Sequence, residues 1–213
     1  MWYLYKIIKI YNLYLGDELK MKSLKGTKTA QNLMNAFAGE SQAKNKYQFY
    51  AKIARKEGFV QIGDVFDETA HNEEMHAKIF FRYLLNDFTG EDVQVTGSYG
   101  VGMASTLENL KFAAKGEDEE DTLYLKFAAE AREEGFEEIA ASFTHIHGIE
   151  AHHRDRFLRL AKNIEEKTVF EKSEPQEWIC TVCGYVHVGN EAPQVCPACK
   201  HPQGYYEVRA DNF

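Results

Sequence analysis

The chain has 213 residues, of which 44% are hydrophobic and 27% are charged, a composition typical of a folded soluble protein. This length allows one moderate domain, or one medium and one very small domain. The net charge of −8 argues against a nucleic acid or an anionic membrane as a partner, because both carry negative charge themselves.

The first twenty residues, MWYLYKIIKIYNLYLGDELK, differ in composition from the rest of the chain. They form an apolar run, interrupted by Lys6 and Lys9, that is too short to span a bilayer and lacks the basic segment and cleavage site of a signal peptide. An anchor at a membrane surface is the alternative to a simple extension. We expect residues 1–20 to be an extension without an assigned function, ahead of a domain that begins near Met21.

An internal repeat organises the middle of the chain. When residues 32–82 are aligned without gaps to residues 109–159, 77 positions later, 18 of the 51 positions are identical. The stretch ARKEGF at 54–59, for example, falls on AREEGF at 131–136. Identity at this level indicates a duplicated structural unit.

Each unit is predicted to form two helices joined at a glycine, because apolar residues recur at helical spacing on both sides of Gly58 and Gly135. The helices are expected over about 29–57, 60–85, 106–134 and 136–165. A polar, glycine-rich stretch over 86–105 connects the two units. Two long hairpins joined by a long crossover predict a mainly α fold, a ferritin-like four-helix bundle over residues 21–166.

The acidic residues that the repeat preserves indicate a metal site in this bundle. Three residues of the first unit recur in the second, which pairs Glu40 with Glu117, Glu73 with Glu150 and His76 with His153. Residues three apart share a helix face, so each Glu-x-x-His pair can converge on one ion. One Glu from each of two helices, with a Glu-x-x-His from each of the other two, is the ligand pattern of di-iron and di-manganese bundles.

A solvated surface pair is the alternative for a single Glu-x-x-His in so charged a helix. Two such pairs at equivalent repeat positions, each with a Glu 33 residues upstream, favour metal binding. Burying four carboxylates without cations would cost several kcal/mol for each of them. Four glutamates with two neutral histidines carry a charge of −4, which matches two divalent ions.

Three further residues lie on the faces that carry these acids. Glu120 follows Glu117 by three residues and is either a fifth carboxylate ligand or a surface acid. Tyr47 and Tyr124 each follow by seven residues a Glu that occurs in both repeat units, so each shares the helix face of that Glu. They either donate hydrogen bonds to ligand carboxylates or serve as core aromatics, and we favour the donor role for Tyr47.

Residues 177–213 are predicted to form a separate small domain, after a polar linker over 167–176. All four cysteines lie in it as two C-x-x-C pairs, Cys180 with Cys183 and Cys196 with Cys199, and 12 residues separate the pairs. This clustering indicates one tetrahedral metal site rather than a disulfide framework. The spacing alone is equally compatible with zinc and with iron.

From about Met21 to Phe213 the chain resembles the rubrerythrins. The resemblance rests on FAGESQAKNKY, ETAHNEEMHAK, GEDEED and GIEAHHRDRF in the bundle and on CTVCGYVH and CPACKHP in the C-terminal unit, which is similar to rubredoxin. It implies a di-iron centre that reduces hydrogen peroxide to water and a mononuclear Fe(Cys)₄ centre that passes electrons to it. It further implies a cytoplasmic homodimer or small homo-oligomer that defends against oxidative stress.

The resemblance also implies roles for individual residues. It makes Glu40, Glu73, Glu117, Glu150 and His153 iron ligands, and it makes Glu120 and His76 two ligands that exchange on one iron during turnover. We therefore expect Glu120, His76 and Tyr47 to act in catalysis. No nucleotide-binding fingerprint is present, so NAD(P)H would act through a separate reductase or a rubredoxin. A ferroxidase or other iron-handling protein with a zinc ribbon, and an oxidase that reduces O₂, are the alternative functions.

Overall fold

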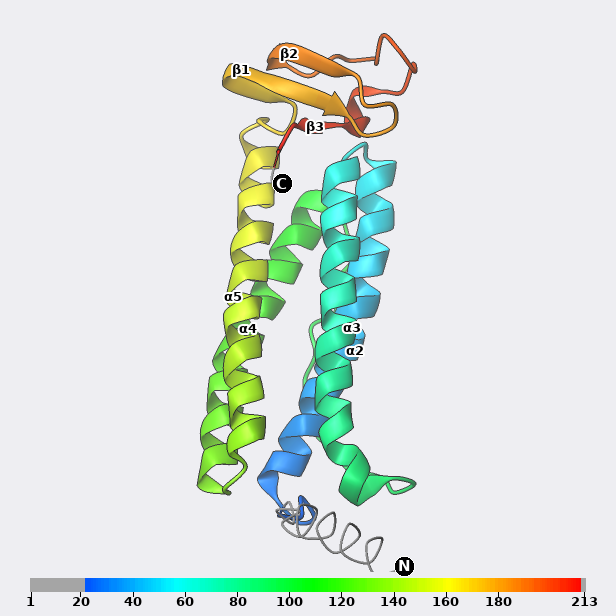
Figure 1. Ribbon diagram of the computed structural model, residues 1–213. Helices are drawn as coiled ribbons and strands as arrows, with labels where there is room; N and C mark the ends of the chain where they lie inside the picture. The colour runs from blue at the N-terminus through cyan, green and yellow to red at the C-terminus, as the bar shows by residue number, and fades with distance from the viewer. Residues whose placement is uncertain (1–21, 212–213) are drawn as a thin grey trace, which may run out of the picture.

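The computed structural model describes residues 22–211, so the predicted extension over 1–20 lies outside the described residues. Four long helices form the bundle (Figure 1), and they are α2 (Lys28–Lys56), α3 (Val60–Phe88), α4 (Thr106–Glu133) and α5 (Glu137–Glu165). The prediction of a mainly α four-helix bundle is confirmed. Helix α3 continues three residues beyond its predicted end at 85, because Phe88 packs against the apolar core. In the part of the chain that the structure describes, no helix is long and apolar enough to cross a membrane.

The two halves of the repeat form two hairpins with matching turns. Gly58 ends the first hairpin's leading helix with φ +86° and Gly135 ends the second's with φ +80°, a left-handed conformation that glycine adopts without steric cost. In both turns the next residue donates to a carbonyl five residues back, Phe59 to Ala54 and Phe136 to Ala131, at 2.8 Å each. The prediction that a glycine ends each leading helix is confirmed.

Each hairpin carries, at the turn between its two helices, a carboxylate that caps a helix of the other hairpin. Glu57 accepts a hydrogen bond from the backbone N–H of Thr106 at 2.9 Å, at the start of α4. Its repeat counterpart Glu134 accepts from the backbone N–H of Thr29 at 2.8 Å, at the start of α2. An acid at a helix N-terminus satisfies N–H groups that lack a partner within the helix and interacts favourably with the helix dipole. These reciprocal contacts fix the two hairpins in register.

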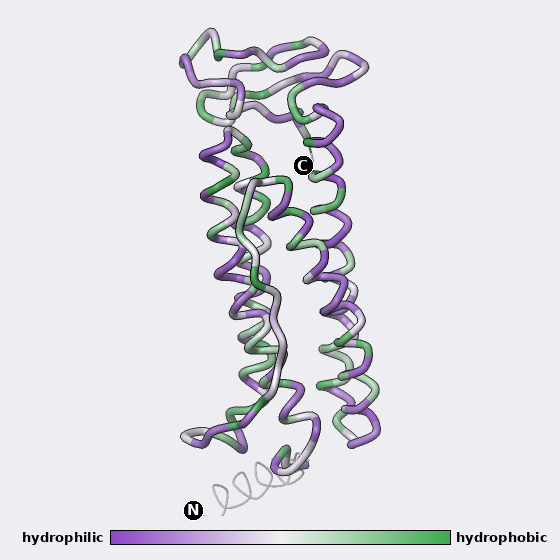
Figure 2. The backbone as a smooth tube through the Cα atoms, turned by 180° about the vertical axis from the view of Figure 1, so that it is seen from behind, coloured by the Kyte–Doolittle hydropathy of each residue, from purple (hydrophilic) through white to green (hydrophobic). Residues whose placement is uncertain are grey.

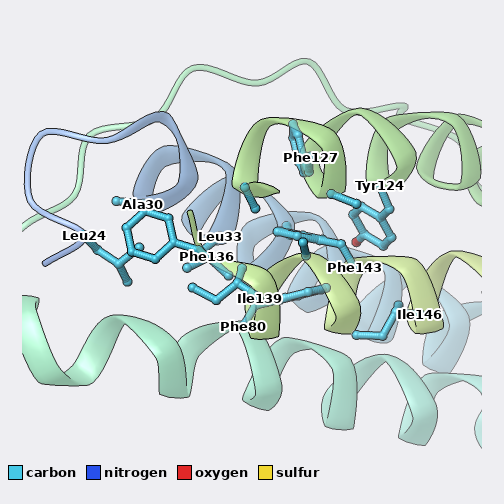
Figure 3. Close-up of a cluster of buried hydrophobic side chains, with 14 of the residues drawn as sticks. Leu24, Ala30, Leu33, Phe80, Tyr124, Phe127, Phe136, Ile139, Phe143 and Ile146 are labelled. Carbon is cyan, nitrogen blue, oxygen red and sulfur yellow. The ribbon is translucent and has the colours of Figure 1, made fainter. Parts of the chain in front are cut away.

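The bundle core consists of two apolar clusters with a polar layer between them. The first cluster, part of which Figure 3 shows, contains Leu33, Phe80, Tyr124 and Phe143 and lies toward the α4–α5 turn. The second lies toward the α2–α3 turn and contains residues such as Phe66. Along every helix, the predicted ligands come between residues of the first cluster and residues of the second. The acids thus occupy a layer closed off on both sides by apolar side chains.

The crossover over 89–105 runs along the bundle from one hairpin to the other (Figure 2). Two tyrosines hold it against α2: the Tyr50 hydroxyl donates to the carbonyl of Gly102 at 2.7 Å, and the Tyr99 hydroxyl donates to the carbonyl of Asn35 at 3.4 Å. The seam between α2 and α4 is therefore covered by irregular chain rather than by another helix.

The C-terminal unit is a small sheet at the end of the bundle (Figure 1). Its strands are β1 (Glu171–Cys180), β2 (Val186–Glu191) and β3 (Tyr206–Val208), antiparallel in the order β2-β1-β3. A short 3₁₀ turn, Gln203–Tyr205, precedes β3. Strand β1 begins inside the segment 167–176 that the sequence predicts to be a linker, although its pairing with β2 is irregular between Glu171 and Gln176. Pro175 lies in that irregular stretch, where its missing N–H donor is tolerated.

A close glycine contact seats this unit on the bundle. A Cβ atom on Gly204 would lie 2.3 Å from the carbonyl oxygen of Gly58, so no larger residue fits there without a shift. Beside this contact, the rings of Phe59 and Phe170 stack with centroids 6.1 Å apart. The sheet therefore rests on the α2–α3 turn through backbone and aromatic contacts.

Replacing the capping acid should destabilise the bundle. We expect Glu134→Ala to lower the free energy of unfolding by about 1 kcal/mol, because the first N–H groups of α2 lose their acceptor. Urea unfolding of this variant beside Glu133→Ala, an exposed neighbour without such a contact, measures the effect. Equal stability of the two variants would contradict the capping role.

Candidate metal centre

Four fully buried glutamates, one from each helix, meet in the polar layer of the bundle. Their side chains are 0% exposed, and they are Glu40 on α2, Glu73 on α3, Glu117 on α4 and Glu150 on α5. His76 and His153 lie in the same layer and are 4% and 1% exposed. The structure thus brings together the six residues that the repeat pairs.

The two histidines face the acids in mirrored fashion. His76 Nδ1 lies 3.0 Å from Glu73 Oε2 and 3.0 Å from Glu150 Oε1. His153 Nδ1 lies 2.9 Å from Glu150 Oε2 and 3.1 Å from Glu73 Oε1. Glu73 and Glu150 therefore each contact both imidazoles, whose ring centroids are 6.1 Å apart.

These contacts define two overlapping ligand groups. The ligand atoms of each group lie within 4.8 Å of one another, and the groups are Glu40, Glu73, His76 and Glu150, and Glu73, Glu117, Glu150 and His153. Each offers carboxylate oxygens and an imidazole nitrogen, a donor set that suits iron, manganese and zinc. Glu73 and Glu150 belong to both groups, so two ions held here would be neighbours.

Unpaired oxygens in the layer show that the residues fit a pair of cations. Among the residues that the structure describes, Glu40 Oε2 and Glu117 Oε2 have no hydrogen-bond partner, and a histidine Nδ1 lies 3.7 Å from the first and 3.9 Å from the second. Glu73 Oε1 and Glu150 Oε1 make no well-aligned hydrogen bond, although a histidine Nδ1 lies 3.1 Å and 3.0 Å away. Leaving a buried charged oxygen without a partner is costly, and a metal ion removes that cost. These four carboxylate oxygens and the two inward-facing Nδ1 atoms are a ready coordination set.

Without metal ions, burial and mutual contacts shift the pKa values of the groups in this layer. Burial raises the pKa of Glu40 and of Glu117 well above 4.5. Burial alone would lower the pKa of each histidine, but hydrogen bonds to the carboxylates outweigh it, so that the pKa of His76 lies far above 6.5 and that of His153 rises to about 12. Burial opposes ionisation of Glu73 as well, yet the two imidazoles lower its pKa to about 2. The layer thus attracts positive charge, whether from protons or from metal ions.

Two buried tyrosines donate to ligand carboxylates across the repeat. The Tyr47 hydroxyl on α2 donates to Glu117 Oε1 on α4 at 2.5 Å. The Tyr124 hydroxyl on α4 donates to Glu40 Oε1 on α2, also at 2.5 Å. The sequence favours a donor role for Tyr47, and the structure places both tyrosines in that position. Tyr124 in addition packs against Phe143 in the apolar cluster (Figure 3), with ring centroids 5.7 Å apart.

Glu120 differs from the other predicted ligands in its position, because it lies outside both ligand groups. Burial raises the pKa of Glu120 well above 4.5, and the charge of Glu40 adds to this. Its Oε2 is shielded from solvent and without a partner among the described residues, while its Oε1 would lie 3.5 Å from a Cβ on Gly39. Glu120 thus stands beside the layer, and its role as a ligand stays a prediction.

A cavity of about 600 Å³ adjoins Glu120 between α2, α4 and the crossover. Its lining includes Gly39, Tyr99, Gly116 and Tyr124. The two glycines immediately precede Glu40 and Glu117 in the sequence, so neither position adds a side chain to the cavity wall beside these two acids. Sequence reasoning missed this cavity, since the position of the crossover depends on long-range contacts.

Asn72 was also missed by the sequence analysis. Its Oδ1 lies 3.3 Å from His153 Nε2, the ring nitrogen that faces away from the acids. The available signal was a break in the repeat, because residue 149, which is equivalent to residue 72, is an isoleucine.

The four cysteines of the C-terminal unit form a second metal site, and their sulfur atoms all lie within 4.8 Å of one another. Cys180 Sγ is 3.6 Å from Cys199 Sγ, and Cys183 Sγ is 3.7 Å from Cys196 Sγ. Both pairs sit on similar turns, in which the residue after the second cysteine has a left-handed backbone, with φ +76° at Gly184 and +65° at Lys200. Four thiols in this arrangement suit a tetrahedral ion such as iron or zinc.

Family models match nearly all of the described chain. The rubrerythrin model matches residues 31–103 and 108–181, and the model for the rubredoxin-like domain of rubrerythrin matches residues 178–207. Rubrerythrin-1 of Clostridium acetobutylicum is 54% identical over 91% of this chain and 100% of its own length. The rubrerythrin of Porphyromonas gingivalis is 50% identical, over 90% of this chain and 95% of its own.

Solved structures show the same architecture. A partially reduced nigerythrin superposes with a TM-score of 0.59 at 30% identity, over 88% of this chain and 89% of the other. A Mycobacterium tuberculosis bacterioferritin superposes with a TM-score of 0.58 at 19% identity, over 67% of this chain and 90% of the other, a likeness of fold alone.

Metal removal should make the stability of the bundle fall as pH rises. Above pH 6.5, the folded metal-free protein keeps protons on His76 and His153 that the unfolded chain has released. Stability therefore decreases with increasing pH in this window. Bound cations replace those protons. We expect the Tm of chelator-treated protein to fall between pH 6.5 and about 9, so that the difference in Tm between metal-loaded and chelator-treated protein widens. A difference in Tm that stays constant with pH would contradict this account.

Proposed function

The chain belongs to the rubrerythrin family, and we propose that it is a non-haem di-iron peroxidase that reduces hydrogen peroxide to water in defence against oxidative stress. One observation carries this proposal: a buried layer suited to two redox-active cations stands in the same chain as a four-cysteine site suited to an electron-transfer ion. The bundle holds a di-iron carboxylate centre, and the C-terminal unit holds a rubredoxin-like metal site.

The proposed reaction consumes one H₂O₂, two protons and two electrons and yields two waters. An iron pair, when bound, supplies the two electrons that cleavage of the O–O bond requires. The chain's own residues hold and shield the reacting centre. Glu73 and Glu150 belong to both ligand groups and would hold the two cations as neighbours. Tyr47 and Tyr124 orient Glu117 and Glu40 through their hydroxyl groups, and the apolar clusters exclude bulk water.

The cavity between α2, α4 and the crossover supports access for a small uncharged substrate. Its lining includes Gly39 and Gly116, which precede Glu40 and Glu117, together with the side chains of Tyr99 and Glu120. Peroxide that arrives by this route would meet the side of the centre that carries Glu120 and Glu40. We infer that Glu120 and His76 are alternative ligands of the ion on this side.

Electrons are proposed to enter through the cysteine site. Cys183 is exposed, whereas Cys180 and Cys196 are buried, so the site is open to a partner on the Cys183 side. We propose that the donor is a rubredoxin or a separate NAD(P)H-linked reductase, that the chain acts as a homodimer or small homo-oligomer, and that it works in the cytoplasm.

A ferroxidase, or an oxidase that reduces O₂, would use the same carboxylate layer. The cysteine site favours an enzyme that receives electrons over an iron store, since storage has no need of an electron relay. Turnover measured separately with peroxide and with O₂ distinguishes the peroxidase from the oxidase. A visible spectrum of the air-oxidised protein distinguishes Fe(Cys)₄ from colourless zinc.

Removing the Glu120 carboxylate should impair turnover. We expect Glu120→Ala to lower the rate of peroxide consumption by about 10-fold or more, because one ion loses a ligand from its cycle. Glu119→Ala is the matched control, since Glu119 is exposed and pairs with Lys115. A Glu120→Ala protein that consumes peroxide at the full rate would refute the ligand role.

A further inference from the structure

We propose that Asn72 fixes the ring of His153, whereas its repeat counterpart Ile149 leaves the ring of His76 free, so that the two halves of the metal centre are not equivalent. This inference rests on the proposed function, because it concerns how the chain presents two histidines to the same pair of ions. It assigns to Asn72 the role of a positioning residue.

The starting point is the close symmetry of the layer. The repeat places Glu73 on Glu150 and His76 on His153, and the two Nδ1 atoms lie at 2.9 to 3.1 Å from the same two carboxylates. On the side that faces the ions, nothing in these distances distinguishes one histidine from the other. A difference in behaviour must therefore come from the far side of each ring.

The far sides do differ. Asn72, on α3, reaches across to α5, where its Oδ1 lies 3.3 Å from His153 Nε2. The residue equivalent to Asn72 is Ile149 on α5, an alkyl side chain that cannot accept a hydrogen bond, and it is 39% exposed. The hydrogen bond and ion pairs of His76 are all made by Nδ1, and no protein group among residues 22–211 pairs with its Nε2.

The chemistry of imidazole gives this difference a consequence. A neutral histidine that binds a cation through Nδ1 carries its proton on Nε2. An amide oxygen that accepts this proton fixes both the tautomer and the orientation of the ring. His153 is held in this way. His76 can turn away from the layer without breaking a hydrogen bond at its far nitrogen.

His76, whose ring no protein group holds at Nε2, and the buried carboxylate of Glu120 lie on the same side of the layer. Glu120 Oε1 approaches the position of Gly39, the residue before Glu40, and Glu40 belongs to the ligand group that contains His76. The ion of that group thus has near it a histidine with a free ring and a buried carboxylate with a free oxygen. The other group has a histidine that Asn72 holds in place.

The ring protons provide a direct test that needs no turnover. Zinc is diamagnetic, so ¹H–¹⁵N spectra of zinc-loaded protein with ¹⁵N-labelled histidine can report each Nε2 proton. We expect a slowly exchanging Nε2 proton for His153 and none for His76. Asn72→Leu should remove the His153 signal, and Ile149→Asn should create one for His76. Asn86→Leu, at an exposed position on the same helix, should change neither.

Metal affinity gives a second, independent measurement. In Co²⁺ titrations against a competing chelator, we expect Asn72→Leu to weaken the affinity for one of the two bundle ions by about 10- to 100-fold. The affinity for the other bundle ion should not change. Ile149→Asn should increase the affinity for the ion of the group that contains His76. Because Ile149 is partly exposed, this variant tests the proposal even where Asn72→Leu does not fold.

The outcomes separate this inference from the proposed function. Equal exchange of both ring protons in the unchanged protein, or equal loss of affinity for both ions in Asn72→Leu, would overturn it. Absence of peroxide turnover with the expected spectra and affinities would sink the peroxidase but leave the asymmetry in place. Peroxide turnover together with equal exchange of the two ring protons would support the peroxidase and overturn the asymmetry.

Discussion

The burial of four carboxylates in one layer is the constraint on which the rest of the structure depends. The layer lies between two apolar clusters, and each of its glutamates is fully buried. Uncompensated negative charge in such surroundings would cost more than the packing around it could offset. Cations between the acids resolve this conflict, and they also give the bundle its chemistry.

Duplication explains how so demanding a layer can form. Each hairpin supplies half of the ligands, and neither half can close the layer alone. The caps from Glu57 and Glu134 and the hydrogen bonds from Tyr47 and Tyr124 all cross from one half to the other. Contacts that hold the halves together are thus the same contacts that align the acids. The departures from symmetry at Asn72 and Glu120 are then the places where the two ion positions become different.

Much of the fold and most of the ligand set could be predicted because both follow from local patterns and from the repeat. Helical spacing gave the four helices, and the recurrence of Glu and Glu-x-x-His selected six residues that do meet. The features that the sequence could not show depend on contacts between distant parts of the chain. The position of Glu120 outside both groups and the contact of Asn72 depend on how neighbouring helices are rotated. The start of β1 at Glu171 depends on pairing with a strand that comes later in the chain.

Metal content measured on substituted protein tests the central claim most directly. Two bundle groups and one cysteine group predict three ions in each loaded chain. Glu73 belongs to both bundle groups, so Glu73→Ala should retain only the ion of the cysteine site, whereas Glu40→Ala should lose a single ion. Retention of all three ions by the Glu73→Ala protein would contradict the account.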